Sequence, residues 1–243
     1  MKNIILTISE NIPLTENVWK AVLTGENAGV PVPGRFVNIK IDGLFLRRPI
    51  SVCDSDDNSV TVIYKVVGKG TDALSKMKIG EKLDVLSDLG NGYDTTPSGD
   101  KPLLIGGGVG TPPMYMLAKK LISEGKTPTV ILGFNTKKEI FFENEFRKTG
   151  AKTIIATADG SVGIKGFVTD AMKDIEYSYI YTCGPEPMLK AVYRASKTSG
   201  QFSFEERMGC GFGACMGCSC KTVTGYKRIC KDGPVLSKEE ILW

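Results

Sequence analysis

The sequence of 243 residues contains no histidine. Histidine is the most frequent general acid and base, a usual ligand of catalytic zinc and the paired ligand of Rieske iron–sulfur centres. Its absence excludes sites of these three kinds. We therefore expect the demanding chemistry to belong to a bound cofactor, and we predict no catalytic side chain.

The sequence also lacks a hydrophobic run long enough to span a membrane, and the apolar stretch within residues 1–10 is too short for a signal peptide and has no cleavage site after it. The net charge is +4, but the basic residues form no block and no stripe interleaved with aromatic residues, which argues against nucleic-acid binding. We expect a cytoplasmic protein without membrane or nucleic-acid partners. In a reducing compartment, clustered cysteines indicate metal binding rather than disulfides.

The chain divides into regions of different pattern. Residues 1–98 contain short alternating runs, such as 36–41 and 60–67, between turn residues, which predicts an antiparallel β-barrel. Residues 99–200 alternate apolar strands with helical stretches, which predicts an α/β domain with a doubly wound parallel sheet. Residues 201–243 are rich in glycine and cysteine and too short to bury a core unaided, so we expect a small domain built around a metal centre.

The pattern of the middle region is regular enough to place its elements. The expected strands are 103–105, 130–132, 153–156 and 179–182, and the expected helices are 114–123, 140–148, 168–172 and 188–196. Outside this region we expect a short helix at 72–77 and an extended piece at 201–205.

Cysteine is concentrated in one stretch, residues 210–220, which contains four of the seven cysteines. Cys210, Cys215 and Cys218 have the spacing C-x4-C-x2-C, and Cys230 follows after eleven further residues. This is the spacing of plant-type [2Fe-2S] proteins. We predict that these four thiolates are the cluster ligands.

The glycines of the same stretch support this interpretation. Gly211, Gly213 and Gly217 would let the loop wrap closely around a compact cluster and direct N–H groups at its sulfurs. A structural zinc site would more naturally contain two C-x2-C pairs, and inert buried thiols are not expected to gather in a glycine-rich loop. Cys220 lies off the ligand spacing, and we interpret it as a thiol that binds no iron.

The first region contains two short motifs that suit phosphate binding. Arg48 and Ser51 lie where one strand leads into the next and could present a guanidinium and a hydroxyl to one phosphate. Residues 68–71, G-K-G-T, form a glycine turn that opens a helix, where free N–H groups favour a pyrophosphate. A surface arginine would look the same, but the two motifs together suggest a dinucleotide flavin.

The second region opens with a strand and a glycine loop, residues 103–113, which resembles a dinucleotide-binding turn. Thr111 stands where the third glycine of G-x-G-x-x-G would be, so an ordinary tight strand-to-helix turn remains an alternative. The next strand ends in Asn135 and Thr136 rather than an acidic residue, which leaves the choice between NAD and NADP open. Cys183 follows a later strand, at the edge where such sheets bind ligands, although a structural cysteine would look the same.

The order of these motifs resembles the ferredoxin–NADP reductase superfamily over residues 1–200. The motifs are R-P-I-S, G-K-G-T, L-G-N-G, G-G-G-V-G-T-P-P and C-G-P-E-P-M. With the cysteine segment included, the whole chain is similar to the electron transfer subunits of the NAD-dependent, B-type dihydroorotate dehydrogenases. The cysteine segment is the most specific part of the likeness, because the glycine motifs occur throughout the superfamily.

The resemblance implies FAD, a [2Fe-2S] cluster and NAD as cofactors. It also implies a partner, the FMN-containing catalytic subunit that oxidises dihydroorotate to orotate in pyrimidine biosynthesis, in a heterotetramer with two copies of each chain. The family pattern assigns FAD contacts to Arg48, Pro49, Ile50, Ser51, Ile63, Tyr64, Lys65, Gly70 and Thr71. It assigns nicotinamide contacts to Gly106, Gly107, Gly108, Gly110, Cys183, Gly184 and Pro185. Ile50 departs from the superfamily, which usually has a tyrosine against the flavin ring.

The cofactor set itself indicates a role. An iron–sulfur cluster transfers single electrons and nicotinamide accepts a hydride, so a flavin, which can do both, must lie between them. We hypothesise that electrons enter at the cluster loop, at the partner interface, and leave on NAD. Two alternatives remain. One is a subunit of an electron-bifurcating ferredoxin:NAD(P) oxidoreductase, against which Cys210 argues because that family has an aspartate as its first ligand. The other is a zinc-stabilised interaction module without redox activity.

Overall fold

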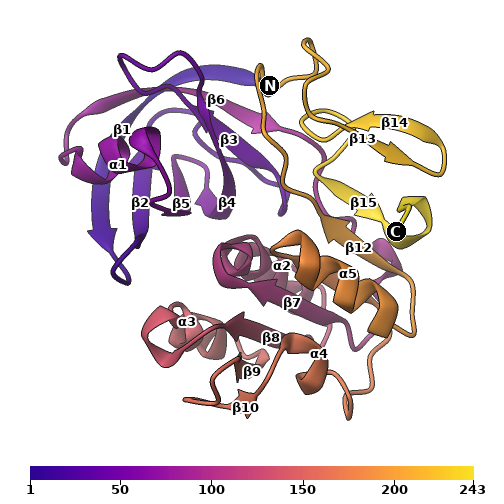
Figure 1. The fold of residues 1–243 in the computed structure, drawn as a ribbon. Helices are drawn as coiled ribbons and strands as arrows, with labels where there is room; N and C mark the ends of the chain where they lie inside the picture. The colour runs from indigo at the N-terminus through magenta and orange to yellow at the C-terminus, as the bar shows by residue number, and fades with distance from the viewer.

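The computed structural model describes all of residues 1–243, and Figure 1 shows its barrel, its sheet and its C-terminal segment. The barrel is closed and antiparallel, in the strand order β1-β2-β5-β4-β3-β6. Its strands are β1 (Lys2–Pro13), β2 (Val18–Thr24), β3 (Phe36–Ile39), β4 (Arg48–Asp56), β5 (Ser59–Lys65) and β6 (Lys82–Leu89). Helix α1 (Lys69–Lys76) connects β5 to β6. The predicted β-barrel is confirmed.

The barrel interior follows from the alternation of the strands. In β6, Leu83, Val85 and Leu89 are buried while the residues between them, apart from Ser87 on the inner face, remain partly exposed. Successive side chains of a strand point to opposite faces, so one face of each strand supplies the core. Most of the buried apolar residues of the six strands form one cluster, which α1 closes with Leu74, whereas a few such as Leu89 pack with residues of the sheet.

The second part is a seven-stranded sheet in the order β10-β9-β8-β7-β11-β12-β15. Its strands are β7 (Leu103–Gly107), β8 (Thr129–Phe134), β9 (Lys152–Thr157), β10 (Ile164–Lys165), β11 (Ile180–Cys183), β12 (Gly200–Ser203) and β15 (Val235–Ser237). Its helices are α2 (Thr111–Ser123), α3 (Glu143–Lys148), α4 (Val168–Ala171) and α5 (Glu186–Ala195). All pairs are parallel except β12 with β15, which confirms the predicted α/β fold.

Both faces of this sheet are covered. Leu104 of β7 packs in the same apolar cluster as Leu117 of α2, whereas its neighbours Leu103 and Ile105 pack in the cluster that contains Leu189 of α5. Strands buried on both faces read as continuous apolar runs, which explains why the sequence shows no alternation here. None of the helices combines the length and apolar character that a membrane span requires.

Four helix starts differ from the prediction. Helix α1 begins at Lys69 rather than 72 and α5 at Glu186 rather than 188. Helix α2 begins at Thr111 rather than 114, because Pro112 and Pro113 occupy its first turn, where a missing N–H costs nothing. Helix α3 begins at Glu143 rather than 140, because Phe142 has a left-handed backbone with φ of 63°. Phe142 packs edge-on against Tyr115 of α2. This tertiary contact therefore overrides the helical tendency of residues 140–142.

The C-terminal segment is docked on both other parts of the chain. It returns to the sheet through β15, and its hairpin β13 (Ser219–Thr222) and β14 (Gly225–Arg228) lies beside that strand (Figure 1). The side chain of Asn91, just after the barrel, accepts a hydrogen bond from Val235 N at 3.0 Å and donates one to Val235 O at 2.8 Å. Cys218 and Cys230 pack in the apolar cluster that covers one face of the sheet. The buried residues of the segment thus pack in a core that it shares with the rest of the chain.

Candidate cofactor sites

A cavity of about 580 Å³ lies at the carboxyl ends of β7, β8 and β11. After β7 the chain turns to β8 on one side, whereas β11 lies on the other side and leads to β12. Such a reversal of strand order is where open α/β sheets bind nucleotides. The wall includes Gly107, Gly108, Gly110, Gly184 and Pro185, so the structure brings two of the predicted glycine motifs together. The cavity has the position and size of a nucleotide site.

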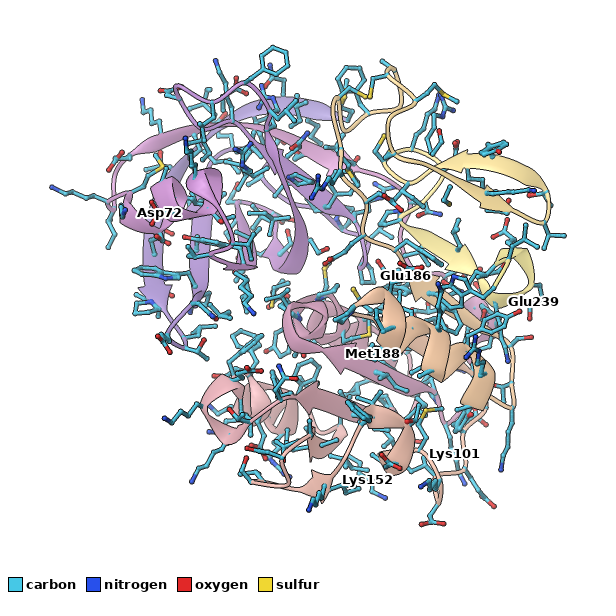
Figure 2. All side chains as sticks on the ribbon, viewed as in Figure 1. Asp72, Lys101, Lys152, Glu186, Met188 and Glu239 are labelled. Atoms are coloured by element: carbon cyan, nitrogen blue, oxygen red, sulfur yellow. The ribbon has the colours of Figure 1, made fainter.

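These two motifs are in direct contact, which requires glycine. A Cβ atom on Gly110 would lie 2.3 Å from the carbonyl oxygen of Cys183 and 2.6 Å from Cα of Gly184. Gly107 faces Met188 of α5, whose sulfur would lie 2.4 Å from an added Cβ, and Figure 2 shows Met188 between α5 and β7. Gly106 lies outside the cavity wall and packs on the backbone of Thr111 instead. The loop is therefore closely fitted to the ligand edge of the sheet.

Cys183 lies beneath this cavity with its thiol buried. Burial raises the pKa of the Cys183 thiol to about 12, and the nearby Glu205 carboxylate adds to the shift. The thiol is therefore neutral at physiological pH and is unsuited to act as a nucleophile.

Three residues of the cavity wall were not predicted for this site from the sequence. Lys65, predicted for the flavin, lines this cavity as well. Glu205 lines the same wall, and burial raises the pKa of its carboxyl. Glu139 lines the wall beside β8 and accepts hydrogen bonds from Asn135 N at 3.1 Å and Asn135 Nδ2 at 2.9 Å. For Glu139 the available signal was a glutamate five residues beyond the end of strand β8, whereas the sequence offered no signal for Glu205.

The two phosphate-binding motifs of the barrel also meet. A Cβ atom on Gly70 would lie 1.9 Å from Nε of Arg48, so the guanidinium packs directly on the first turn of α1. Arg48 forms no salt bridge and donates only to the carbonyls of Leu46 and Arg47. A cation beside the positive end of a helix is favourable when an anion bridges them. This arrangement fits a phosphate group.

The remaining flavin candidates occupy both faces of their strands. Pro49 is exposed and Ser51 partly exposed on β4, while Ile50 is 8% exposed and packs inside the barrel. On β5, Tyr64 also points inward, where its hydroxyl donates to Asn11 Oδ1 at 3.0 Å, and Ile63 packs toward the sheet domain. A ligand on the outer face would therefore meet Tyr64 through its backbone. Thr71 donates to Gly68 O at 3.2 Å, which holds the turn.

The four predicted ligand cysteines fall into two pairs. The N–H of Cys210 lies 3.5 Å from Sγ of Cys215, and the N–H of Cys215 lies 3.5 Å from Sγ of Cys210. The N–H of Cys230 lies 3.4 Å from Sγ of Cys218. No three ligating side chains converge on a single ion position. A cluster of two irons takes two protein ligands on each iron, whereas structural zinc takes four around one point, so the pairs fit a binuclear centre better.

The two pairs differ in environment. Cys215 is exposed and Cys210 partly buried, whereas Cys218 and Cys230 are each only 2% exposed. Burial raises the pKa of Cys210, but hydrogen bonds from following backbone N–H groups outweigh it and bring the pKa to about 6. Burial and the adjacent Cys218 raise the pKa of Cys230 to about 12. Cys210 is thus more readily deprotonated than Cys230, and metal binding requires the thiolate form.

Glycines shape the loop that carries these cysteines. Gly211 and Gly213 have φ of +79° and +93°, and a Cβ on either would collide with Asn38 or Lys231. Asn38 Nδ2 also donates to Cys210 O at 3.4 Å, which places the loop against strand β3. Cys220 lies on the hairpin β13–β14, partly buried and outside both pairs.

Comparison with known proteins decides the family. The family model for the iron–sulfur cluster binding domain of dihydroorotate dehydrogenase B matches residues 205–242, and that for an oxidoreductase NAD-binding domain matches residues 104–194. The dihydroorotate dehydrogenase B (NAD(+)) electron transfer subunit of Geobacillus sp. (strain WCH70) is 43% identical over 256 residues, covering 100% of this chain and 99% of that protein. The subunit of Fusobacterium nucleatum subsp. nucleatum is also 43% identical, covering 97% and 96%. The chain belongs to this family of electron transfer subunits.

As a member of the family, the chain is an NAD-linked oxidoreductase subunit of dihydroorotate dehydrogenase B and acts in pyrimidine biosynthesis. The name implies a catalytic subunit as its partner. A solved structure of NADH-dependent reduced ferredoxin-NADP oxidoreductase, from work on flavin-based electron bifurcation, superposes with a TM-score of 0.88 at 30% identity and covers 98% of this chain and 90% of that one. Phthalate dioxygenase reductase shares the fold, with a TM-score of 0.69 at 15% identity over 91% of this chain and 87% of that one.

Proposed function

We propose that this electron transfer subunit binds FAD on the barrel, a [2Fe-2S] cluster between Cys210, Cys215, Cys218 and Cys230, and NAD in the cavity of the sheet domain. The FAD domain comprises residues 1–98, the NAD domain residues 99–200 and the cluster domain residues 201–243. The unpaired Arg48 guanidinium on the first turn of α1 supports the FAD assignment, and the paired cysteines support the cluster.

One observation carries the proposal: the three sites are contiguous. The loop of Cys210 contacts Asn38 of β3, and Asn38 is the register partner of Pro49 in the flavin motif on β4. Neighbouring strands lie about 5 Å apart. On the other side, Lys65 ends the flavin run on β5 and lines the NAD cavity. This contiguity supports a flavin bound between the cluster loop and the NAD cavity.

The side chains bind and orient rather than react. When bound, a flavin supplies both one-electron and hydride transfer, which links a one-electron cluster to nicotinamide. Arg48 and the N–H groups of α1 hold the phosphates, and the Gly107–Gly110 loop admits the dinucleotide backbone. The buried thiol of Cys183 is neutral and does not compete as a nucleophile beside the cavity.

The partner is the FMN-containing catalytic subunit, in a heterotetramer with two copies of each chain. The surface of the cluster loop supports this interface: Phe212 is 44% and Met216 55% exposed, beside the exposed Cys215. Exposed apolar side chains around a redox centre suit a protein interface, and electron transfer needs the partner to approach the cluster.

The experiment is reconstitution with the partner. Purified anaerobically, the chain should show flavin absorbance together with iron and acid-labile sulfide. Mixed with the catalytic subunit and dihydroorotate, it should reduce NAD⁺ to NADH while orotate forms in equal amount, because two electrons and a proton pass to each NAD⁺. A colourless chain containing zinc, or a recurrent co-purifying companion that cannot oxidise dihydroorotate, would contradict the proposal.

The FAD site gives a second prediction. Gly70→Ala should weaken FAD binding by about 10- to 100-fold, the value of a hydrogen bond to a charged group, because the new Cβ would lie 1.9 Å from Nε of Arg48 and displace the guanidinium. Fluorescence titration of the flavin-free protein with FAD measures the loss. Gly68→Ala is the matched control, since Gly68 has extended backbone and nothing within 4 Å of an added Cβ. Equal affinities for the two variants would remove Arg48 from the site.

A further inference from the structure

The segment after β8 carries charges of both signs beside the cavity. Lys137, Lys138 and Glu139 form one 3-10 turn directly beyond the end of the strand. Both lysines are exposed and neither lines the cavity, whereas Glu139 is part of its wall. A ligand in the cavity therefore meets the carboxylate of Glu139 rather than the ammonium groups, although this turn contains two lysines and only one acidic residue.

The Glu139 carboxylate is held in place. Its Oε2 accepts from the backbone N–H of Asn135 at 3.1 Å and from Asn135 Nδ2 at 2.9 Å, while its Oε1 makes no hydrogen bond within the chain. The turn itself is fixed because Lys137 N donates to Ser161 Oγ at 2.8 Å. One carboxylate oxygen is thus oriented by the end of β8, and the other is left to accept from a ligand.

An aromatic ring lies on the same wall. Phe167 is 70% exposed, although it lines the cavity beside Gly166. Purine bases stack on exposed aromatic faces of this kind. A carboxylate and a free ring on one wall match the ribose hydroxyls and the base of an adenosine.

From this geometry we infer that Glu139 determines the specificity for NAD over NADP. Its free oxygen accepts hydrogen bonds from the adenosine ribose hydroxyls, and its charge repels the 2′-phosphate that distinguishes NADP. The inference rests on the assignment of this cavity to NAD in the proposed function. It adds the residue that recognises the ribose, because the spacing of the glycine motif does not distinguish NAD from NADP.

The test compares Glu139→Gln with Glu143→Gln. Glu143 is a matched control because it pairs with Arg147 on α3 and does not line the cavity. Calorimetric titration with ADP-ribose and with its 2′-phosphorylated form measures binding without reference to turnover. The ratio of the two affinities in the wild-type subunit should fall by about 10- to 100-fold in Glu139→Gln, as expected for a lost hydrogen bond to a charged group. It should be unchanged in Glu143→Gln. Flavin reduction by NADH and NADPH in the holoprotein should shift in parallel.

The outcomes separate the inference from the function on which it rests. Amide hydrogen exchange of the wild-type subunit with ADP-ribose should protect residues 106–111 and 184–188. If those residues are protected and the affinity ratio of Glu139→Gln equals that of the wild type, the role of Glu139 is overturned and the cavity remains the NAD site. If neither segment is protected, the NAD site itself is misplaced.

Discussion

Replacing Cys218 by serine is expected to remove the iron–sulfur cluster, from about two irons per chain to almost none. Cys218 is 2% exposed, and its sulfur accepts from Cys230 N, so no neighbouring side chain can take its place. A serine hydroxyl is a far poorer ligand for iron than a thiolate. Iron and sulfide analysis, with the visible spectrum, measures the loss. Reduction of NAD⁺ by the complex in the presence of dihydroorotate should disappear. Oxidation of NADH should persist when an artificial acceptor takes electrons directly from the flavin.

Cys220 supplies the control for this result. It lies only two residues along the chain but belongs to neither sulfur pair, and burial raises the pKa of its thiol. Cys220→Ser should therefore retain the full iron content and the activity of the complex. Loss of iron from Cys220→Ser together with retention in Cys218→Ser would show that the ligand set is different.

Replacing Gly110 by alanine is expected to damage both the fold and the NAD site. The added Cβ would lie 2.3 Å from Cys183 O and 2.6 Å from Cα of Gly184, which are backbone atoms that cannot rotate away. Overpacking of this kind costs about 1–3 kcal/mol, or about 2–10 °C in melting temperature for a chain of this size. Because the strand ends that form the cavity must separate, NADH binding should weaken by at least about tenfold.

The control variant Gly125→Ala separates the loss of stability from the loss of NADH binding. Gly125 follows α2 with φ of +78° and has nothing within 4 Å of an added Cβ, so alanine there meets only backbone strain, worth about 1–2 kcal/mol. Both variants should melt earlier in calorimetry, but only Gly110→Ala should lose affinity for NADH. A Gly110→Ala protein that melts and binds like the wild type would show that the two loops are not packed as described.

The sequence predicts the elements better than their contacts. Strands β7, β8, β9 and β11 were predicted within two residues, because apolar runs bounded by turn residues are local signals, whereas the two-residue strand β10 was not predicted. The start of α3 was wrong, since Phe142 adopts its left-handed backbone to pack on Tyr115, a residue far away in the sequence. The docking of β15 on β12 was also beyond local pattern, because three residues carry too little periodicity to identify an edge strand.

The sites divide in the same way. The cysteine spacing already predicted four ligands, because a loop that wraps one small centre must place its sulfurs at short, regular intervals. An acidic residue of the cavity wall, Glu139, was missed. The motif spacing predicts an acidic residue at the end of the strand, whereas Glu139 lies beyond that end. Only the hydrogen bond from the Asn135 side chain and the 3-10 turn direct Glu139 into the cavity. Glu205 reaches the same wall from β12, which no local pattern connects to β7.

By itself, the sequence determined the chemical class of this protein: thiolate ligands for a metal centre, glycine turns for phosphates, and no histidine to suggest another kind of site. Those properties depend on residue types and short spacings. Only the tertiary structure decided that Asn38 lies between the cysteine loop and strand β4, that Lys65 and Glu205 line one cavity, and that Glu139 rather than the two lysines before it is part of that cavity wall. Such contacts join residues from separate strands, and their positions are set by how the barrel and the sheet pack.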